Sequence, residues 1–178
     1  MPALSATVVP LREHPEYCAF FVAAFEAEWP AWYGPGGSGN AAADLQEFAN
    51  RQGSLPVGVV ALGPHHQPLG LAALKATSIP SHSHLSPWAA AGYVVPAWRR
   101  RGVGALLLEA LLSEASRLGY QTVYCATSTS ESLLVRQGWS PMESVFHDGH
   151  SVRVFRCTST RSLSSCASRA ERHSGGGP

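Results

Sequence analysis

The run Arg99-Arg100-Arg101-Gly102-Val103-Gly104 constrains the fold of this chain more than any other segment. It follows the apolar stretch 89–96 and leads into an amphipathic segment. Glycine lets a backbone approach another group closely and adopt angles that other residues resist. The free N–H groups at a helix start bind anions, and arginine guanidinium groups suit phosphate. The run therefore predicts a strand, a glycine-rich turn and a helix that together hold a pyrophosphate.

Two common phosphate-binding motifs do not fit this run. A dinucleotide fingerprint needs G-x-G-x-x-G and a later acidic residue, and a P-loop needs Gly-Lys before Ser or Thr. The order Tyr93-Val94-x-Pro96-x-x-Arg99-x-x-Gly102-x-Gly104 instead resembles the Gcn5-related N-acetyltransferase (GNAT) superfamily, in its bacterial-type branch. The resemblance implies acetyl-CoA as co-substrate, with its pyrophosphate held by Arg99, Arg100, Arg101, Gly102, Val103, Gly104 and Ala105. The alternative is a basic turn before an ordinary surface helix.

The segments that follow extend the resemblance. Helical spacing predicts a helix over residues 103–118 that ends at Gly119. Its expected buried face comprises Val103, Leu106, Leu107, Ala110, Leu111, Ala115 and Leu118. Residues 121–126 are expected to form a strand parallel to the one before the turn. Residues 132–139 resemble the family's last helix, and residues 28–34 and 85–88 resemble stretches of the bacterial branch.

The remaining patterns predict further strands and helices. Strands are expected at 7–11, 57–62 and 69–74, with a hairpin of 140–146 and 151–157 through an Asp148-Gly149 turn. A first helix starts at Pro15 and ends at Pro30, and its expected buried face comprises Tyr17, Phe20, Phe21, Ala24 and Phe25. A second helix spans 41–51, with Leu45 and Phe48 inward and Gly53 as its stop. A flexible acceptor-side loop is expected at 34–39.

Together these elements predict a single α/β domain over residues 1–157. Its expected architecture, which the resemblance also implies, is a mixed twisted sheet with a bent fourth strand and helices on both faces. Residues 158–178 are rich in Ser, Arg and Gly and have almost no apolar residue. Such a segment cannot bury enough surface to become ordered, so a disordered C-terminal tail is expected.

Charge and cysteine content narrow the expected partners. A formal net charge of +1 gives no overall field for nucleic acid or an anionic membrane. No apolar run is long enough for a membrane span, and the N-terminus lacks a secretory pattern. The cysteines (Cys18, Cys125, Cys157 and Cys166) form no C-x-x-C pair and are expected to be buried free thiols. We expect a cytoplasmic protein; whether it forms a homodimer is left open.

Gly92 is expected to mark a bend in the strand before the arginine turn, because glycine within a strand often marks a bulge. The resemblance implies that the gap beside this bend admits the pantetheine arm of acetyl-CoA. It also implies that backbone groups of Gly92, Tyr93, Val94 and Val95 pair with that arm and place an N–H near the thioester oxygen. The alternative is a packing glycine with no ligand.

Acetyl transfer to an amine requires that the ammonium group lose a proton. A second group can donate a proton to the leaving thiolate. The family's usual tyrosine acid is replaced here by Leu134, and Ser132 has the nearest hydroxyl. No carboxylate lies in 88–91, where the family often has a base. His82 and His84 are therefore candidate bases and Glu28 an alternative, although each also fits a solvent-exposed role without function. The H-x-H pair lacks a third ligand of metal-site spacing, so no metal is expected.

Four aromatic residues, Trp29, Trp32, Tyr33 and Trp88, either pack in the core or form a wall that binds the acceptor. Few acidic residues accompany them, which favours a small amine or a peptide N-terminus over a polycationic acceptor. The predicted function is acetyl-CoA-dependent N-acetylation by direct attack of a primary amine. The alternative is a catalytically weak or inactive acyl-CoA-binding module of the same fold.

Overall fold

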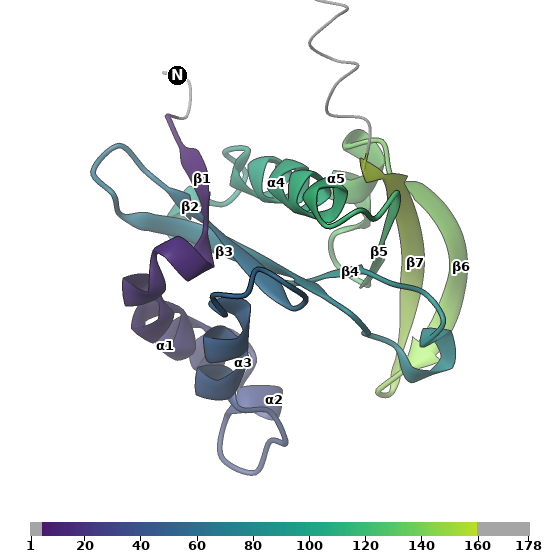
Figure 1. Ribbon diagram of the computed structural model, residues 1–178. Helices are drawn as coiled ribbons and strands as arrows, with labels where there is room; N and C mark the ends of the chain where they lie inside the picture. The colour runs from purple at the N-terminus through teal and green to yellow at the C-terminus, as the bar shows by residue number, and fades with distance from the viewer. Residues whose placement is uncertain (1–4, 160–178) are drawn as a thin grey trace, which may run out of the picture.

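The computed structural model describes residues 5–159, in which seven strands form one sheet in the order β1-β2-β3-β4-β5-β7-β6 (Figure 1). The β4–β5 pair is parallel and the other neighbouring pairs are antiparallel, which confirms the expected mixed sheet. Figure 1 shows the β5, β7 and β6 half turned steeply against the β1–β3 half. The strands are β1 (Thr7–Pro10), β2 (Val57–Leu62), β3 (Pro68–Lys75), β4 (Trp88–Val94), β5 (Thr122–Thr127), β6 (Ser140–His147) and β7 (His150–Thr158).

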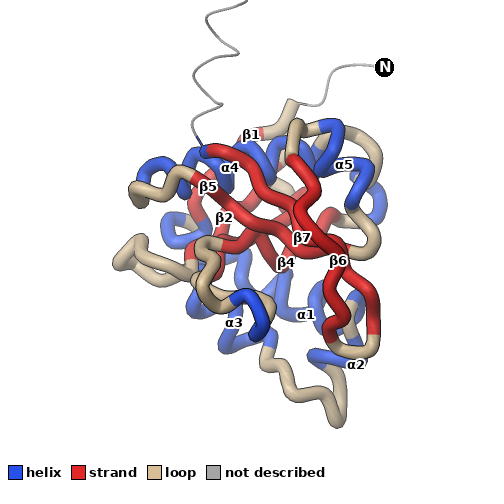
Figure 2. Tube along the Cα trace, turned by 90° about the vertical axis from the view of Figure 1, so that its right-hand side faces the viewer, coloured by secondary structure: helices blue, strands red, loops and turns tan. Residues whose placement is uncertain are grey.

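Helices cover both faces of this sheet, as expected from the sequence (Figures 1 and 2). Alternate residues of β2 point to opposite faces, since side chains along a strand alternate. Val59 packs in the core cluster that includes α4, whereas Val60 packs in the cluster that includes α1 and α3. The helices are α1 (Cys18–Glu28), α2 (Pro30–Tyr33), α3 (Ala41–Phe48), α4 (Val103–Arg117) and α5 (Glu131–Arg136). Four short 3-10 turns are η1 (Leu11–Glu13), η2 (Pro15–Tyr17), η3 (Pro80–His82) and η4 (Pro96–Trp98).

The structure confirms two turns that the sequence predicted, the helix end at Gly119 and the hairpin turn at Asp148 and Gly149. Gly119 has φ +87°, and the amides of Gly119 and Tyr120 donate to the carbonyls of Ser116 and Ala115, which closes α4 as a Schellman motif. Asp148 and Gly149 both have positive φ, as a primed hairpin turn between β6 and β7 requires.

The first two helices depart from the expected pattern. Phe20 is 44% exposed, so it lies on the solvent side of α1 rather than on the buried face. Pro30 does not simply end the first helix, because it begins the short α2. Helix α3 stops at Phe48, before the expected end at 51, because the Asn50 amide donates to nearby carbonyls and turns the chain. Helix propensity alone does not reveal that a side chain will donate hydrogen bonds to nearby backbone carbonyls and end the helix.

The ends of the later elements differ by small amounts from the predicted ones. In α4, Leu106, Ala110 and Leu118 are only partly buried, whereas Leu112 joins the core. Strand β7 continues to Thr158, and the buried Ser159 donates its amide to Gln121. The rest of the expected tail, with Cys166, lies outside the described residues. Within residues 5–159, no helix combines the length and apolar character needed to traverse a bilayer.

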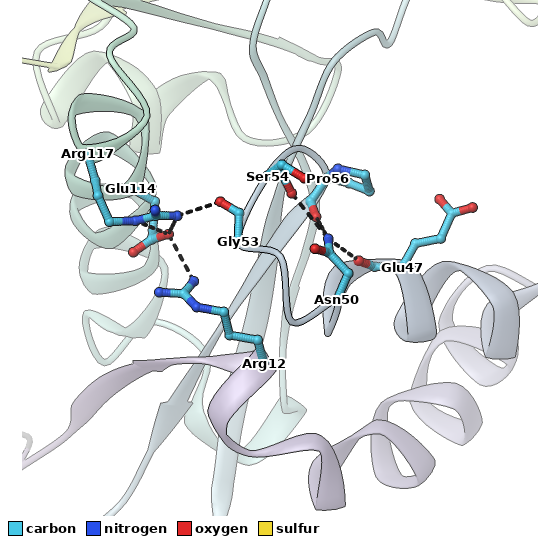
Figure 3. A network of polar contacts seen from close by, with 8 residues as sticks. All are labelled: Arg12, Glu47, Asn50, Gly53, Ser54, Pro56, Glu114 and Arg117. Carbon is cyan, nitrogen blue, oxygen red and sulfur yellow. Dashed lines mark hydrogen bonds and ion pairs between the residues drawn. The ribbon is translucent and has the colours of Figure 1, made fainter.

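A polar network fixes α4 against the opposite side of the fold (Figure 3). Glu114 Oε2 lies 3.2 Å from Arg12 Nη1 and 2.8 Å from Arg117 Nη2, and Arg117 also donates to the Gly53 carbonyl. Burial raises the pKa of Glu114, but hydrogen bonds and charge from Arg117 and Arg12 outweigh it and hold the pKa below its usual value. The network thereby joins α4 to η1 and to the loop before β2.

Replacing Glu114 with Gln is expected to lower the free energy of unfolding near neutral pH by about 1–3 kcal/mol, the range for hydrogen bonds to charged groups. Because the pKa of Glu114 is lowered in the folded state, its contribution is present above the ordinary carboxyl pKa and disappears as pH falls through the lowered one. Denaturant unfolding across this acid range should show the two proteins converging. Glu109→Gln, an exposed change on the same helix, is the control. A difference that stays constant with pH would contradict the assignment.

Candidate functional site

The sheet opens between β4 and β5, and this opening organises the site. The two parallel strands share only the pairs Trp88–Tyr124 and Ala89–Cys125 and then separate. A cavity of about 260 Å³ lies there, lined by residues 89–94 of β4, by one face of α4 and by the turn from β5 into α5. The cavity lies at the carboxyl ends of parallel strands, where α/β folds commonly bind ligands.

A β-bulge bends β4 beside this cavity. Tyr93 pairs with Leu71 and Ala90 pairs with Ala73, so Ala91 and Gly92 together oppose the single residue Ala72. The bend expected at Gly92 is therefore present, but the left-handed residue is Ala91, with φ +52°. A Cβ at Gly92 would meet nothing within 4 Å. Ala91 holds an unfavourable backbone conformation of the kind that concentrates at functional sites.

The turn into α4 has the geometry of an anion cradle. Gly102 is the N-cap with φ +90°, and the first amide bond back to it comes from Leu106. The amides of Val103, Gly104 and Ala105 are therefore the free ones at this helix start. A Cβ on Gly104 would lie 3.0 Å from Leu133 Cδ2, so glycine permits close packing of α4 on α5. The helix dipole and these amides suit a pyrophosphate.

The three arginines of the turn do not act as one group. Arg101 places its guanidinium 5.3 Å from the Trp98 ring centroid, while Arg100 has a positive φ and is exposed. Arg99 turns toward the opposite helix layer, where its Nη2 lies 2.9 Å from Glu28 Oε1. The Arg99 side chain thus contacts a different helix layer from Arg101, which lies on Trp98 in its own turn. At Val95, the amide donates to the Leu69 carbonyl and the carbonyl accepts from the Trp98 amide.

An aromatic cluster of Tyr93, Phe25, Trp29 and Tyr33 (the Tyr93 cluster) lies on the α1 side of the sheet. The Tyr93 ring meets those of Phe25 and Trp29 edge-on, each with centroids 6.2 Å apart, and Phe25 stacks on Tyr33 at 5.7 Å. Burial, together with the Glu28 charge, raises the pKa of Tyr93, although Arg99 opposes the shift. Tyr33 donates to Asp44 at 2.7 Å, and burial with that carboxylate raises its pKa. Both hydroxyls thus remain protonated at neutral pH.

The four aromatic residues proposed as an acceptor wall are not brought together. Trp29 and Tyr33 share the Tyr93 cluster, but Trp88 is fully buried and donates its indole N–H to the Leu85 carbonyl. Trp88 is therefore a core residue. Trp32 is 48% exposed, meets the Tyr33 ring edge-on at 6.4 Å and lies against Gly39, so only Trp88 is separate from the other three.

The candidate bases and acid lie outside the cavity. His82 is buried in η3, with Nδ1 2.8 Å from Ser81 Oγ and Nε2 3.1 Å from Glu143 Oε1 on β6. His84 stacks on it at 5.9 Å. Ser132 is exposed on α5. Neither these three residues nor Glu28 lines the cavity, although Glu28 lies beside the Tyr93 cluster that borders it.

Sequence reasoning overlooked the hydroxyl-bearing turn after β5. Thr127, Thr129 and Ser130 all line the cavity, and Thr127 Oγ1 accepts the amide of Ser130 at 2.9 Å. The available signal was the run of four hydroxyl residues at 127–130, which begins at the end of β5, since ligands meet this kind of sheet there. Cys125 also lines the cavity, and burial raises the pKa of its thiol to about 12.

Comparisons with known proteins agree with this geometry. A family model described as the acetyltransferase (GNAT) family matches residues 21–135. Similar structures include an aminoglycoside 6′-N-acetyltransferase complexed with coenzyme A, with TM-score 0.69, 12% identity, and 86% of this chain and 97% of that one covered. YncA from Salmonella typhimurium with its cofactor acetyl-CoA has TM-score 0.66, 15% identity and coverages of 88% and 95%. Spermidine/spermine N-acetyltransferase SpeG from Vibrio cholerae, complexed with manganese ions, has TM-score 0.62, 14% identity and coverages of 90% and 96%. No curated protein matches the sequence.

Replacing Gly104 with Glu is expected to weaken acetyl-CoA binding by about 100-fold or more, because a carboxylate near a phosphate adds several kcal/mol of repulsion. The new side chain would also press on Leu133. Titration calorimetry measures the effect. Ser113→Glu, which adds the same charge to an exposed position of α4, should bind like the wild type. Unchanged affinity in Gly104→Glu would place the phosphate site elsewhere.

Proposed function

The chain belongs to the GNAT acetyltransferase family and uses acetyl-CoA, and from this premise we propose that it transfers the acetyl group directly to a primary amine. The acceptor is an amine on a small molecule or at a peptide N-terminus. The observation that carries the proposal is the cavity between β4 and β5, which runs beside the anion cradle and the Tyr93 cluster. The anion cradle can bind acetyl-CoA, and the Tyr93 cluster can bind the acceptor.

The chain's own groups suit each part of acetyl-CoA. The amides of Val103, Gly104 and Ala105, with Arg100 and Arg101, hold the pyrophosphate. The bulged backbone of Gly92, Tyr93 and Val94 lies along the cavity and pairs with the amides of the pantetheine arm like an added strand. Acetyl-CoA supplies the activated acetyl group as a thioester.

The bulge also supports acyl transfer. A fixed backbone N–H beside the thioester carbonyl stabilises the negative charge that develops on its oxygen when the amine nitrogen attacks. Cys125 stays a neutral thiol near physiological pH because its pKa is raised to about 12, so it does not compete as a nucleophile. The carbon–sulfur bond then breaks directly, and no acetylated enzyme forms.

Proton transfer is shared between residues at the edge of the cavity. Glu28, next to Tyr93, receives the amine proton, since His82 and His84 lie outside the cavity. Ser130 takes the place of Ser132 as the hydroxyl near the leaving sulfur, because it lines the cavity. A thiolate is a tolerable leaving group near neutral pH, so a weak donor slows the reaction without abolishing it.

The acceptor is proposed to approach from the Tyr93 cluster. The Glu28 carboxylate and the partly exposed ring of Trp29 attract an ammonium group, whereas the buried Tyr93 ring already faces the Arg99 guanidinium. Two of the similar structures are, by name, N-acetyltransferases of amines, an aminoglycoside and spermidine/spermine. Few carboxylates surround this cluster, which favours an acceptor with one ammonium group over a polyamine.

A catalytically weak acyl-CoA-binding protein is the second candidate. Its support is that, among the described residues, no carboxylate or imidazole lines the cavity, and Leu134 forms part of its wall. Binding of acetyl-CoA without amine-dependent turnover would favour this candidate.

The proposal is tested by measuring free thiol released from acetyl-CoA with n-butylamine, 2-phenylethylamine, spermidine or a peptide with a free N-terminus. Release should depend on a primary amine and yield the acetylated amine by mass spectrometry. The N,N-dimethyl derivative of 2-phenylethylamine, which cannot form a stable amide, should give none. Release at the same rate without any amine would contradict the proposed function.

Replacing Leu134 with Tyr is expected to raise kcat about tenfold over Leu134→Phe, because a positioned proton donor contributes a rate factor of this order or more. The Phe variant has the same ring bulk without the hydroxyl, so it controls for overpacking at this buried position. Steady-state kinetics with saturating acetyl-CoA make the comparison. Equal kcat values would show that protonation of the leaving thiolate is not limiting.

A further inference from the structure

Among the described residues, the Arg99 side chain makes three interactions, all with residues of β4 and α1. Its Nε donates to the Val94 carbonyl at 2.9 Å, and its Nη2 lies 2.9 Å from Glu28 Oε1. Its guanidinium carbon lies 5.8 Å from the Tyr93 ring centroid. The side chain therefore joins the end of β4 to the end of α1, although its own backbone belongs to the turn before α4.

Glu28 is unfavourably placed without this arginine. It is the last residue of α1, where the helix dipole disfavours a negative charge. Arg99 offsets that cost and fixes one oxygen of the carboxylate. Within residues 5–159, Oε2 of Glu28 has no hydrogen-bond or ion-pair partner, and the side chain is 36% exposed. A carboxylate held by one oxygen, with the other open to solvent, is suited to receive a cation.

The carboxylate also lies where the acceptor is proposed to bind. Glu28 is close enough to Tyr93 to raise the pKa of that hydroxyl, and the adjacent Trp29 packs edge-on against the Tyr93 ring. Tyr93 directly follows the bulge at Ala91 and Gly92 and lines the cavity. One side of the cluster is thus charged and the other aromatic, a combination that binds an ammonium group attached to an apolar body.

Arg100 and Arg101 remain for the phosphates. Both are exposed, and within residues 5–159 neither forms an ion pair with a carboxylate. Arg101 stacks on Trp98, which leaves the N–H edge of its guanidinium available. Arg99 therefore contacts a carboxylate, whereas Arg100 and Arg101 are available to bind phosphate.

We propose that Arg99 is a positioning residue of the acceptor site and not a phosphate ligand: it orients Glu28, whose second oxygen binds the ammonium group of the acceptor. The inference rests on the proposed function, because it assumes that acetyl-CoA occupies the cavity and that an amine attacks from the Tyr93 cluster. It assigns amine recognition to Glu28, with the ring of Trp29 beside the carbon attached to the nitrogen.

The first test is a calorimetric titration of acetyl-CoA into Arg99→Ala, Arg99→Lys and the matched control Arg101→Ala. The Arg99 variants should keep the wild-type Kd within about twofold, and Arg101→Ala should raise it about tenfold, as loss of a charged phosphate contact does. The salt dependence of Kd should stay unchanged in the Arg99 variants and weaken in Arg101→Ala, since it reports charge contacts with the phosphates. A loss of affinity and salt dependence in Arg99→Ala equal to that in Arg101→Ala would overturn the proposal.

The second test is kinetic and uses 2-phenylethylamine as the acceptor. Arg99→Ala and Glu28→Gln should each raise the KM for this amine about tenfold, since a hydrogen bond to a charged group contributes about this much, and Arg99→Lys should restore part of the loss. The double variant should be no worse than Glu28→Gln, because Arg99 acts through Glu28. Additive losses, or an unchanged KM in Arg99→Ala, would overturn the proposal. Absence of acetyl-CoA binding by the wild type would instead contradict the proposed function itself.

Discussion

The loss of backbone pairing between β4 and β5 is the constraint on which the rest of this site depends. Two registered pairs hold the strands together, and the bulge at Ala91 and Gly92 then turns β4 away. A cavity between two strands leaves backbone N–H and C=O groups without their sheet partners, which is costly unless a ligand or water satisfies them. That unsatisfied edge is what makes an extended, amide-bearing ligand such as pantetheine a fitting occupant.

The two helix layers contribute different chemistry to this opening. On one face, α4 directs its free amides and dipole toward it, and the network around Glu114 fixes the other end of that helix. On the opposite face, α1 brings Glu28 and Trp29 to the Tyr93 ring. Arg99 links the two faces, because its backbone lies in the turn of one and its side chain ends in the other. Under the proposed function, Arg99 therefore connects the turn beside the donor to the side from which the acceptor approaches.

Local sequence signals predicted most of the fold but only part of the site. The strands, the stop at Gly119 and the hairpin at Asp148 follow from periodicity and turn chemistry, which act over a few residues. The glycine turn at the start of α4 could also be predicted, because its motif is contiguous. Long-range partners were not: the Arg99–Glu28 pair spans both helix layers, and the His82–Glu143 contact joins a loop to β6. Such tertiary contacts decide the direction of a side chain. For this reason the sequence did not show that Trp88 is buried in the core or that His82 lies outside the cavity.

The most direct test of this account is hydrogen–deuterium exchange of the wild-type protein with and without acetyl-CoA. The account predicts that exchange slows in two segments, residues 91–94 at the bulge and residues 103–105 at the start of α4, because their amides acquire partners. Exchange in η3 (Pro80–His82) should stay the same. Slower exchange confined to other segments, or none at the bulge, would contradict the claim that the opening between β4 and β5 holds the cofactor.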